Sequence, residues 1–246
     1  MRTLHARGIF VTGTDTGVGK TIIAGGLAAL FRKWGAKVGV MKPIETGCAQ
    51  EDGRFIPADG LFLKEMAETD LPLETIVPYQ FKEPLAPWVS AQREGMVIDL
   101  DLLVEKFKKI YQENDFVLVE GAGGILVPIG PNFFFLNLIK EFKLPVLIVS
   151  RAALGAINHT LLTLRVAQSE KITVAGIILN HISPEKTIAS ETNPQVISSL
   201  TTVPIWGAIP FYSNLRPQFF FRDAITQLIQ RHLDLTFIQN LFSEQL

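Results

Sequence analysis

Short, continuously apolar runs recur along the chain, and stretches of helical length separate them. The apolar runs cover residues 8–12, 37–41, 116–120, 145–150, 174–179 and 205–209. Because most are continuous rather than alternating, they are typical of strands that helices cover on both faces. Helices are predicted at residues 21–34, 59–68, 100–112, 134–142, 156–170 and 223–233. This alternation predicts an α/β fold with a doubly wound, mostly parallel sheet flanked by helices.

Two unusual stretches fit the same plan. Residues 72–95 hold several prolines and aromatic residues, and we predict an ordered excursion over the surface. Residues 121–139 are uncharged and approach membrane-spanning length, but their four glycines, two prolines and two asparagines would leave backbone groups unpaired in lipid. We expect a loop and a buried helix there. Because no repeat, low-complexity tract or linker is evident, residues 1–246 are predicted to form a single domain.

Composition narrows the classes of function. The 246 residues are 48% hydrophobic and 19% charged, which argues against a disordered chain. The net charge of −1, with scattered Lys and Arg, gives no reason to expect a nucleic-acid or membrane partner. The first apolar run ends at Thr12, too early for a secretory signal. The single cysteine, Cys48, is interpreted as an incidental loop residue and fits a reducing compartment, so we expect a cytoplasmic protein.

A glycine-rich segment at residues 13–21, Gly-Thr-Asp-Thr-Gly-Val-Gly-Lys-Thr, follows the first predicted strand and precedes the first predicted helix. In this position its backbone N–H groups and the positive helix end would face an anion. Lys20 would add a charge toward the β- and γ-phosphates of a nucleotide, and the Thr21 hydroxyl would bind Mg²⁺. The usual phosphate loop has its first glycine at the position of Thr14, whereas here it is Gly13. The alternative is a Gly/Thr turn that carries a lysine by chance.

Other charged residues lie directly after predicted strands or at the start of a predicted helix. Glu120 ends an apolar run, where a carboxylate that holds nucleotide-bound Mg²⁺ is expected. Lys42 also follows a strand, and could converge with Lys20 on a phosphoryl group or be an ordinary surface lysine. Asp59 precedes an amphipathic stretch, so the residues alone favour a helix N-cap over a second Mg²⁺ ligand.

A second strand-to-helix turn, at residues 155–158, could bind another anion such as a carboxylate through its free N–H groups. Asn158 could equally be a simple helix-start residue. His159 is predicted to be packed rather than catalytic, because no orienting acid is evident beside it.

These segments together resemble the dethiobiotin synthetase family. The resemblance is carried by residues 13–21, 42–47 (Lys-Pro-Ile-Glu-Thr-Gly), 58–59, 119–124 (Val-Glu-Gly-Ala-Gly-Gly) and 154–159 (Leu-Gly-Ala-Ile-Asn-His), and it extends from about residue 10 to about residue 210. The shifted first glycine of the phosphate loop is a feature of this family.

The resemblance implies a P-loop NTPase fold and an ATP- and Mg²⁺-dependent cyclo-ligase of biotin biosynthesis. Its substrates would be 7,8-diaminopelargonate and CO₂ or bicarbonate, and its product dethiobiotin. The ureido ring would form through a carbamate and a carbamic-phosphoric anhydride. A homodimer is also expected, in which the turn at residues 155–158 reaches the substrate carboxylate of the partner subunit.

The resemblance assigns roles to particular residues. Lys20 and Lys42 would be catalytic, and Thr21, Asp59 and Glu120 would serve Mg²⁺. The remaining nucleotide contacts would come from Thr16, Gly17, Val18, Gly19 and Gly123 at the phosphates and carbamate, and from Asn180, Pro210, Phe211 and Tyr212 beside adenine. Substrate contacts would come from Thr46, Gly155, Ala156, Ile157 and Asn158.

Four residues depart from the family pattern. Trp88 stands where relatives usually have histidine, and Glu45 is acidic where they tend to be neutral. Both departures concern the substrate side of the predicted site. His181 and Pro217 replace acidic residues seen in some relatives near the nucleotide base.

Two other classes of protein share this pattern. A nucleotide-driven switch of the chromosome-partition type usually carries an extra lysine near the start of its phosphate loop, where this chain has Asp15. A small-molecule kinase would release a stable phosphorylated product and would not require CO₂.

Overall fold

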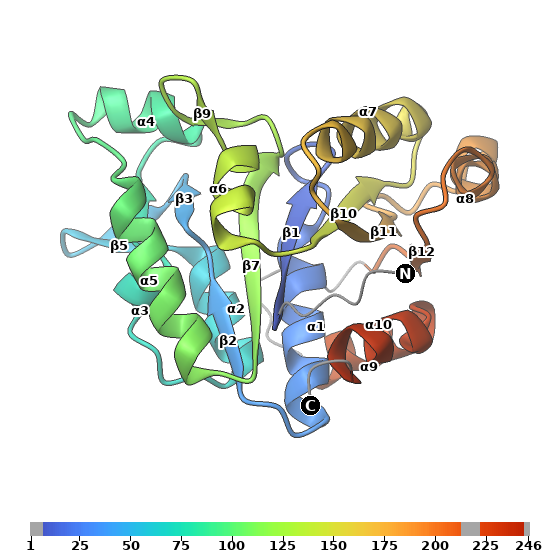
Figure 1. Cartoon of the computed structure of the whole chain (residues 1–246), viewed down its shortest axis with the longest axis horizontal. Helices are drawn as coiled ribbons and strands as arrows, with labels where there is room; N and C mark the ends of the chain where they lie inside the picture. The colour runs from blue at the N-terminus through green and yellow to red at the C-terminus, as the bar shows by residue number, and fades with distance from the viewer. Residues whose placement is uncertain (1–6, 213–221, 244–246) are drawn as a thin grey trace.

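A six-stranded parallel sheet forms the centre of the protein (Figure 1). The computed structural model describes residues 7–212 and 222–243. The strand order is β12-β11-β10-β1-β7-β2, and every neighbouring pair is parallel. The bounds are β1 (Gly8–Gly13), β2 (Val38–Met41), β7 (Phe116–Gly124), β10 (Val146–Arg151), β11 (Val174–Asn180) and β12 (Ile205–Ile209). The predicted α/β fold and its six strands are confirmed, although β7 continues to Gly124.

Helices cover both faces of the sheet, which explains why the strands are continuously apolar. On one side α1 contacts β1, β2, β7, α2 and α9. On the other side α5 and α6 contact β7, α7 contacts β10 and β11, and α8 packs on α7. Figure 1 shows α5 and α6 in front of the sheet and α1 behind it. The bounds are α1 (Lys20–Lys33), α2 (Ala58–Ala67), α5 (Leu100–Glu113), α6 (Phe135–Phe142), α7 (Ala156–Ser169), α8 (Ile188–Leu200), α9 (Arg222–His232) and α10 (Leu235–Ser243).

The strand order reverses beside β1. The chain passes from β1 through α1 to β2 at one edge, whereas it passes from β7 through α6 to β10 on the far side of β1. The carboxyl ends of β1 and β7 therefore flank the crevice in which ligands of such sheets bind. In the register of this pair, Val11 lies opposite Glu120.

Several small elements were not predicted. They are the parallel pair β3 (Ile44–Thr46) and β6 (Tyr79–Phe81), the hairpins β4 (Ala49–Glu51)–β5 (Arg54–Ile56) and β8 (Pro128–Gly130)–β9 (Phe133–Phe134), and the short helices α3 (Leu73–Ile76) and α4 (Pro87–Arg93). The longer helices α8 and α10 were not predicted either. The surface excursion predicted at residues 72–95 is ordered but is not confined to the surface. Ile76, Val77 and Phe81 are fully buried because β6 pairs with β3 and joins the core.

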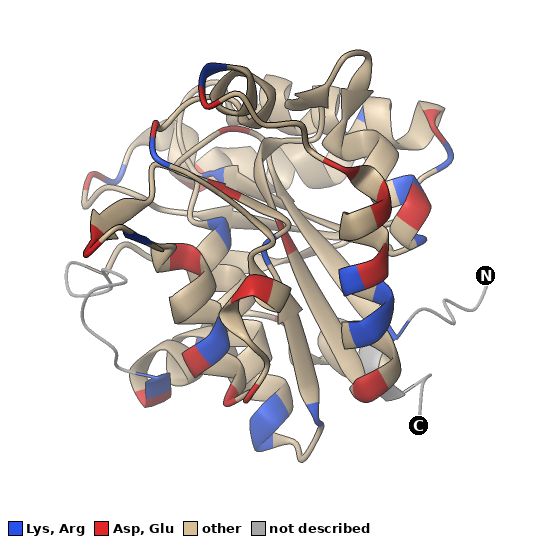
Figure 2. Cartoon of the chain, turned by 90° about the vertical axis from the view of Figure 1, so that its left-hand side faces the viewer, with Lys and Arg blue, Asp and Glu red and all other residues tan. Residues whose placement is uncertain are grey.

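Residues 121–139 form the end of β7, the β8–β9 hairpin and the start of α6. The expected loop and buried helix are therefore confirmed. Among the described residues, no helix combines the length and apolar character that a membrane crossing requires. On the face seen in Figure 2, basic and acidic residues are interspersed, for example along α5.

Candidate active site

The predicted phosphate loop, Lys42 and Glu120 meet at the carboxyl ends of β1, β2 and β7. A pocket of about 390 Å³ lies there. Six of its lining residues are predicted catalytic, metal or substrate residues, namely Lys20, Thr21, Lys42, Thr46, Asp59 and Glu120. Thr16, Gly17, Gly19 and Gly123 line the same pocket. The structure therefore gathers one half of the predicted site from four separate segments of the chain.

The phosphate loop leads into an uncapped helix. Gly19, with φ +92°, is the N-cap residue of α1, so no N-cap side chain binds the first turn. A Cβ atom on Gly19 would collide with the amide nitrogen of Asn180, which donates a 2.8 Å hydrogen bond to the Val18 carbonyl. Val18 itself is buried and does not line the pocket. Because no N-cap side chain binds the first N–H groups of α1, this helix N-terminus suits an anionic ligand.

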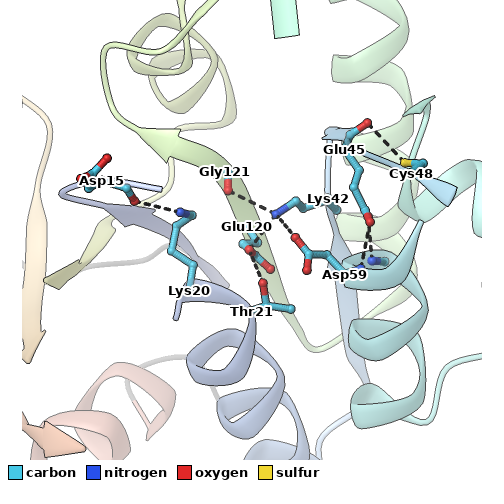
Figure 3. Close-up of polar contacts among 10 residues, drawn as sticks. Asp15, Lys20, Thr21, Lys42, Glu45, Cys48, Asp59, Glu120 and Gly121 are labelled. Carbon is cyan, nitrogen blue, oxygen red and sulfur yellow. Dashed lines mark hydrogen bonds and ion pairs between the residues drawn. The ribbon is translucent and has the colours of Figure 1, made fainter. Parts of the chain in front are cut away.

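Lys42 lies between two carboxylates (Figure 3). Its ammonium is 2.7 Å from Oδ2 of Asp59 and 2.7 Å from Oε1 of Glu120. The Thr21 hydroxyl donates a 2.9 Å hydrogen bond to the same Glu120 oxygen. Lys42 and Glu120 are 3% and 1% exposed. Lys42 is thus not a surface lysine, and the alternative considered for it is wrong.

The charges shift one another's pKa values. Burial alone would lower the pKa of Lys42, but Glu120 and Asp59 raise it above its ordinary value. Burial raises the pKa of Glu120, and Lys42 opposes that effect. Burial also acts to raise the pKa of Asp59, but the Lys42 ammonium and hydrogen bonds from Lys42 and Thr21 hold it below its ordinary value.

Lys20 faces the same pocket with fewer partners. Its ammonium donates a 3.2 Å hydrogen bond to the Asp15 carbonyl. Burial lowers the pKa of Lys20 to about 8, against the opposing effect of Glu120. Figure 3 shows Lys20 and Lys42 on either side of Glu120 and Thr21. A phosphoryl group between the two ammonium groups would offset both the burial and the mutual repulsion of these charges.

Asp59 is not the N-cap of α2. The N-cap is Pro57, and Asp59 is the second residue of the helix, with its carboxylate directed to Lys42. Glu45 takes the capping position instead, since its carboxylate accepts 2.9 Å hydrogen bonds from the N–H groups of Asp59 and Gly60. Burial, with the nearby Asp59 charge, raises the pKa of Glu45 to about 7. Glu45, which is acidic where relatives tend to be neutral, therefore has a structural role at the start of α2.

The donor set fits Mg²⁺ better than a transition metal. In the described part of the chain, no group of three or more His, Cys, Asp or Glu side chains could hold a metal ion. Mg²⁺ is usually held by one or two carboxylates together with substrate phosphates and water. Glu120 Oε2 is buried and has no hydrogen-bond partner. Such an orphaned carboxylate oxygen beside Thr21 and Asp59 fits a hard divalent cation.

The second predicted turn lies apart from this pocket. Gly155, with φ +90°, is the N-cap residue of α7, whose first turn has no side-chain cap. Asn158 and Gly155 are exposed, Ile157 is half-buried and Ala156 is buried. None of the four lines the pocket beside the phosphate loop. His159 is exposed, so the expectation that it is packed is wrong.

The predicted adenine contacts are partly described. Pro210 is half-buried after β12, and Phe211 and Tyr212 are exposed. Asn180 is buried, and its side-chain amide donates a hydrogen bond to the Val18 carbonyl. It does not line the pocket of the phosphate loop. His181 and Trp88 are half-buried, whereas Pro217 lies outside the described residues.

Cys48 is buried between β3 and β4, and burial raises the pKa of its thiol to about 12.

The sequence did not predict one charged contact at the phosphate loop, the ion pair of Arg151 with Asp15. Arg151, at the end of β10, forms a 3.3 Å ion pair with Asp15 across the loop. Both side chains are about half exposed, so this pair adds little stability. Arg151 directly follows the apolar run predicted at residues 145–150, and this position at a strand end is the signal that points to it.

Comparison with known proteins agrees with this geometry. Residues 7–218 match the AAA domain family described as AAA_26. The chain is 41% identical over 236 residues to the ATP-dependent dethiobiotin synthetase BioD of Thermodesulfovibrio yellowstonii, covering 93% of this chain and 96% of that protein. It is 43% identical over 234 residues to the enzyme of the same name from Bacillus licheniformis, covering 95% and 96%. The chain belongs to the dethiobiotin synthetase family. It is therefore an ATP-dependent enzyme of biotin biosynthesis.

Solved structures confirm the P-loop NTPase fold of this family member. The MinD protein of Pyrococcus horikoshii, solved with Mg-ADP, matches with a TM-score of 0.54 at 16% identity, covering 98% of this chain and 94% of that one. A ParA family ATPase from Chlorobium tepidum matches with a TM-score of 0.53 at 14% identity, covering 98% and 97%. At this identity the likeness concerns the fold alone, so it does not favour the switch hypothesis.

Proposed function

We propose that this enzyme closes the ureido ring of dethiobiotin from 7,8-diaminopelargonate and CO₂ or bicarbonate. One amine adds to CO₂ and loses a proton to give a carbamate. A carbamate oxygen then attacks the γ-phosphorus of ATP and releases ADP, which leaves a carbamic-phosphoric anhydride. The second amine attacks the carbonyl carbon, expels phosphate and closes the ring. The names of the relatives support the ATP dependence and the pathway.

The observation that carries this proposal is the convergence of two lysines on one pocket. Lys20 lies in the phosphate loop at the uncapped start of α1, and Lys42 is buried across the pocket between Glu120 and Asp59. Phosphoryl transfer and anhydride breakdown both place negative charge on oxygens, and two fixed ammonium groups would stabilise that charge. Thr46, at the end of β3, also lines the pocket and is proposed to contact the diamine.

Mg²⁺ is proposed to bind Thr21, Asp59 and Glu120. When bound, it would neutralise charge on the nucleotide phosphates. The protein's part is to hold the two carboxylates and the hydroxyl close together, as the hydrogen bonds of Lys42 and Thr21 already do.

The reaction is tested by product formation. Dethiobiotin should form from the diamine, labelled bicarbonate and ATP, with label in the ureido carbon, and should require all three. A phosphorylated product formed without bicarbonate would instead indicate a kinase. Turnover of ATP that responds to a protein or DNA partner and not to the diamine would indicate a switch.

Asp59→Asn is expected to raise the Mg²⁺ concentration needed for half-maximal activity. The amide is a weaker ligand for a hard cation, and higher Mg²⁺ or Mn²⁺ should restore part of the rate. Titrating activity against Mg²⁺ measures this shift. An unchanged Mg²⁺ requirement would remove Asp59 from the metal site.

We also propose a homodimer in which the turn at Gly155–Asn158 serves the partner's pocket. The turn is an uncapped helix start that does not line the pocket of its own chain. The apolar side chains of Leu154 and Leu162, on and beside α7, are 92% and 56% exposed, as expected for a surface covered by another subunit. The single domain and the cytoplasmic location remain predictions.

Asn158→Ala is expected to raise KM for the diamine more than KM for ATP. Mixing Lys20→Ala subunits with Asn158→Asp subunits should then yield hybrid dimers with one intact and one doubly damaged site. Activity above that of either variant alone would support the shared site. If subunits exchange and no activity returns, both determinants belong to one chain.

A further inference from the structure

Glu45 is a buried acidic residue whose carboxylate, among the described residues, accepts hydrogen bonds only from the backbone of another element. It lies on β3 and is 6% exposed. Oε1 accepts the N–H of Asp59 and Oε2 accepts the N–H of Gly60, each at 2.9 Å. Figure 3 shows this carboxylate directed at the start of α2. Both oxygens are thus used to hold one helical turn.

The helix that receives these bonds has no cap of its own. Its N-cap is Pro57, which makes no side-chain cap hydrogen bond. The N–H groups of the second and third helical residues are the donors that an N-cap side chain normally satisfies. Glu45 supplies that acceptor from a segment 14 residues away along the chain, and its negative charge also suits the positive end of the helix.

Gly60 allows the first turn of α2 to pack closely against Val77. A Cβ atom at Gly60 would collide with Val77, so only glycine lets the first turn of α2 lie against the neighbouring segment. Val77 is fully buried beside Ile76, whose carbonyl accepts a 2.8 Å hydrogen bond from the Lys42 N–H. The segment that bears Lys42 and Glu45 is therefore fixed in the core.

Asp59 is held from two directions by this one segment. Lys42 binds its carboxylate at 2.7 Å, and Glu45 binds its backbone N–H at 2.9 Å. β3, which carries Glu45, pairs in register with β6, where Glu45 lies opposite Gln80. The carboxylate of Asp59 is a third exposed, so without these contacts only the Thr21 hydroxyl and the first turn of a short helix would hold it.

We propose that Glu45 is a positioning residue for Asp59, which it holds by its backbone so that the carboxylate stays aligned with Lys42, Thr21 and the metal. This inference rests on the proposed role of Asp59 toward Mg²⁺. Residues that orient a metal ligand commonly change metal affinity by about 10- to 100-fold when they are lost. Glu45 is therefore expected to act on metal affinity through Asp59 and without touching the metal.

The readout is the factor by which Mg²⁺ strengthens ATP binding, here called the Mg²⁺ factor. It is the Kd for ATP in EDTA divided by the Kd for ATP in Mg²⁺, both measured by calorimetry in the absence of diamine. A general weakening of the fold would lower both affinities together and leave this factor unchanged. We expect Glu45→Ala to lower the factor by about 10-fold, as an orienting residue should. Glu45→Gln keeps one acceptor oxygen and should give a smaller loss, and it serves as the test should the alanine variant fold poorly.

Asp99→Ala is the matched control. Asp99 caps α5 by accepting the N–H groups of Asp101 and Leu102, so it is also a carboxylate on two helical N–H groups. It does not line the pocket. Its loss should lower Tm, as the loss of a cap does, and leave the Mg²⁺ factor unchanged.

The double variant Glu45→Ala/Asp59→Asn decides between positioning and an independent effect. If Glu45 acts through Asp59, the double variant should lower the Mg²⁺ factor no further than Asp59→Asn alone. The positioning role would be overturned if the losses of the Mg²⁺ factor in the two single variants added in full in the double variant. It would also be overturned if Asp59→Asn lowered the Mg²⁺ factor while both Glu45 variants kept it normal. A normal factor in Asp59→Asn itself would instead overturn the proposed metal role of Asp59.

Discussion

Lys42→Ala is expected to lower kcat by ~10²-fold or more and also to destabilise the protein. The loss of rate follows from removing a preorganised charge that acts on the transition state. The loss of stability follows from the contacts, since Lys42 is buried between Glu120 and Asp59. Removing one partner of a buried ion pair costs about 3–5 kcal/mol. In a chain of this size that corresponds to a fall in Tm on the order of 10 °C, measured by scanning calorimetry.

A paired variant separates the two effects of Lys42. Lys42→Met combined with Glu120→Gln removes both buried charges and leaves side chains of similar size. It should recover much of the lost Tm, because no uncompensated carboxylate remains at Glu120, while kcat stays low. Near-normal kcat in folded Lys42→Ala protein would remove Lys42 from the catalytic residues. An unchanged Tm in that variant would contradict the stabilising role of the pair.

The central sheet could be predicted because burial on both faces leaves a direct mark on sequence. β1 and β2 are buried at every position, and both were evident as continuous apolar runs. The order of the strands also follows from rules of connection once helices alternate with strands. Those rules bring the residues after β1, β2 and β7 to one edge, so the convergence of Lys20, Lys42 and Glu120 was predictable.

Helix α8 was missed because its pattern is weak. Most of its residues face solvent, and Pro194 lies inside it, which usually argues against a helix. The helix is stabilised at its start, where Thr187 and Ser190 form a capping box. The pair β3–β6 was missed for another reason, since each strand has three residues and depends on a partner that is more than 30 positions distant.

The side-chain contacts that shape the site were the least predictable part. Asp59 looked like a helix cap because an acidic residue stood at a helix start, yet Glu45 provides the cap and frees Asp59 for Lys42. Similarly, the side-chain amide of Asn180, at the end of β11, donates a hydrogen bond to the Val18 carbonyl in the phosphate loop. Both contacts depend on how elements far apart in sequence are placed, and neither leaves a local pattern.

Lys20→Ala is expected to lower kcat by ~10²-fold or more without lowering Tm, in contrast to Lys42→Ala. The two substitutions remove the same charge from the same pocket, but the surroundings of the charges differ. Lys20 donates to the Asp15 carbonyl and forms no ion pair among the described residues, whereas Lys42 binds two carboxylates. Burial lowers the pKa of Lys20 to about 8, so its ammonium is held at a cost to the folded state. Its charge becomes favourable when phosphates are bound, and most of all in the transition state.

Lys33→Ala is the matched control, because Lys33 lies on the same helix α1, is exposed, and binds Gln230 at 3.1 Å rather than the pocket. It removes an equal charge from the same element and should leave kcat unchanged. Steady-state rates and thermal unfolding of the three lysine variants are compared under one set of conditions. A fall in Tm for Lys20→Ala as large as that for Lys42→Ala would show that Lys20 has a buried anionic partner. A normal kcat would mean that the phosphate loop works without its lysine, and the catalytic assignment of Lys20 would then be wrong.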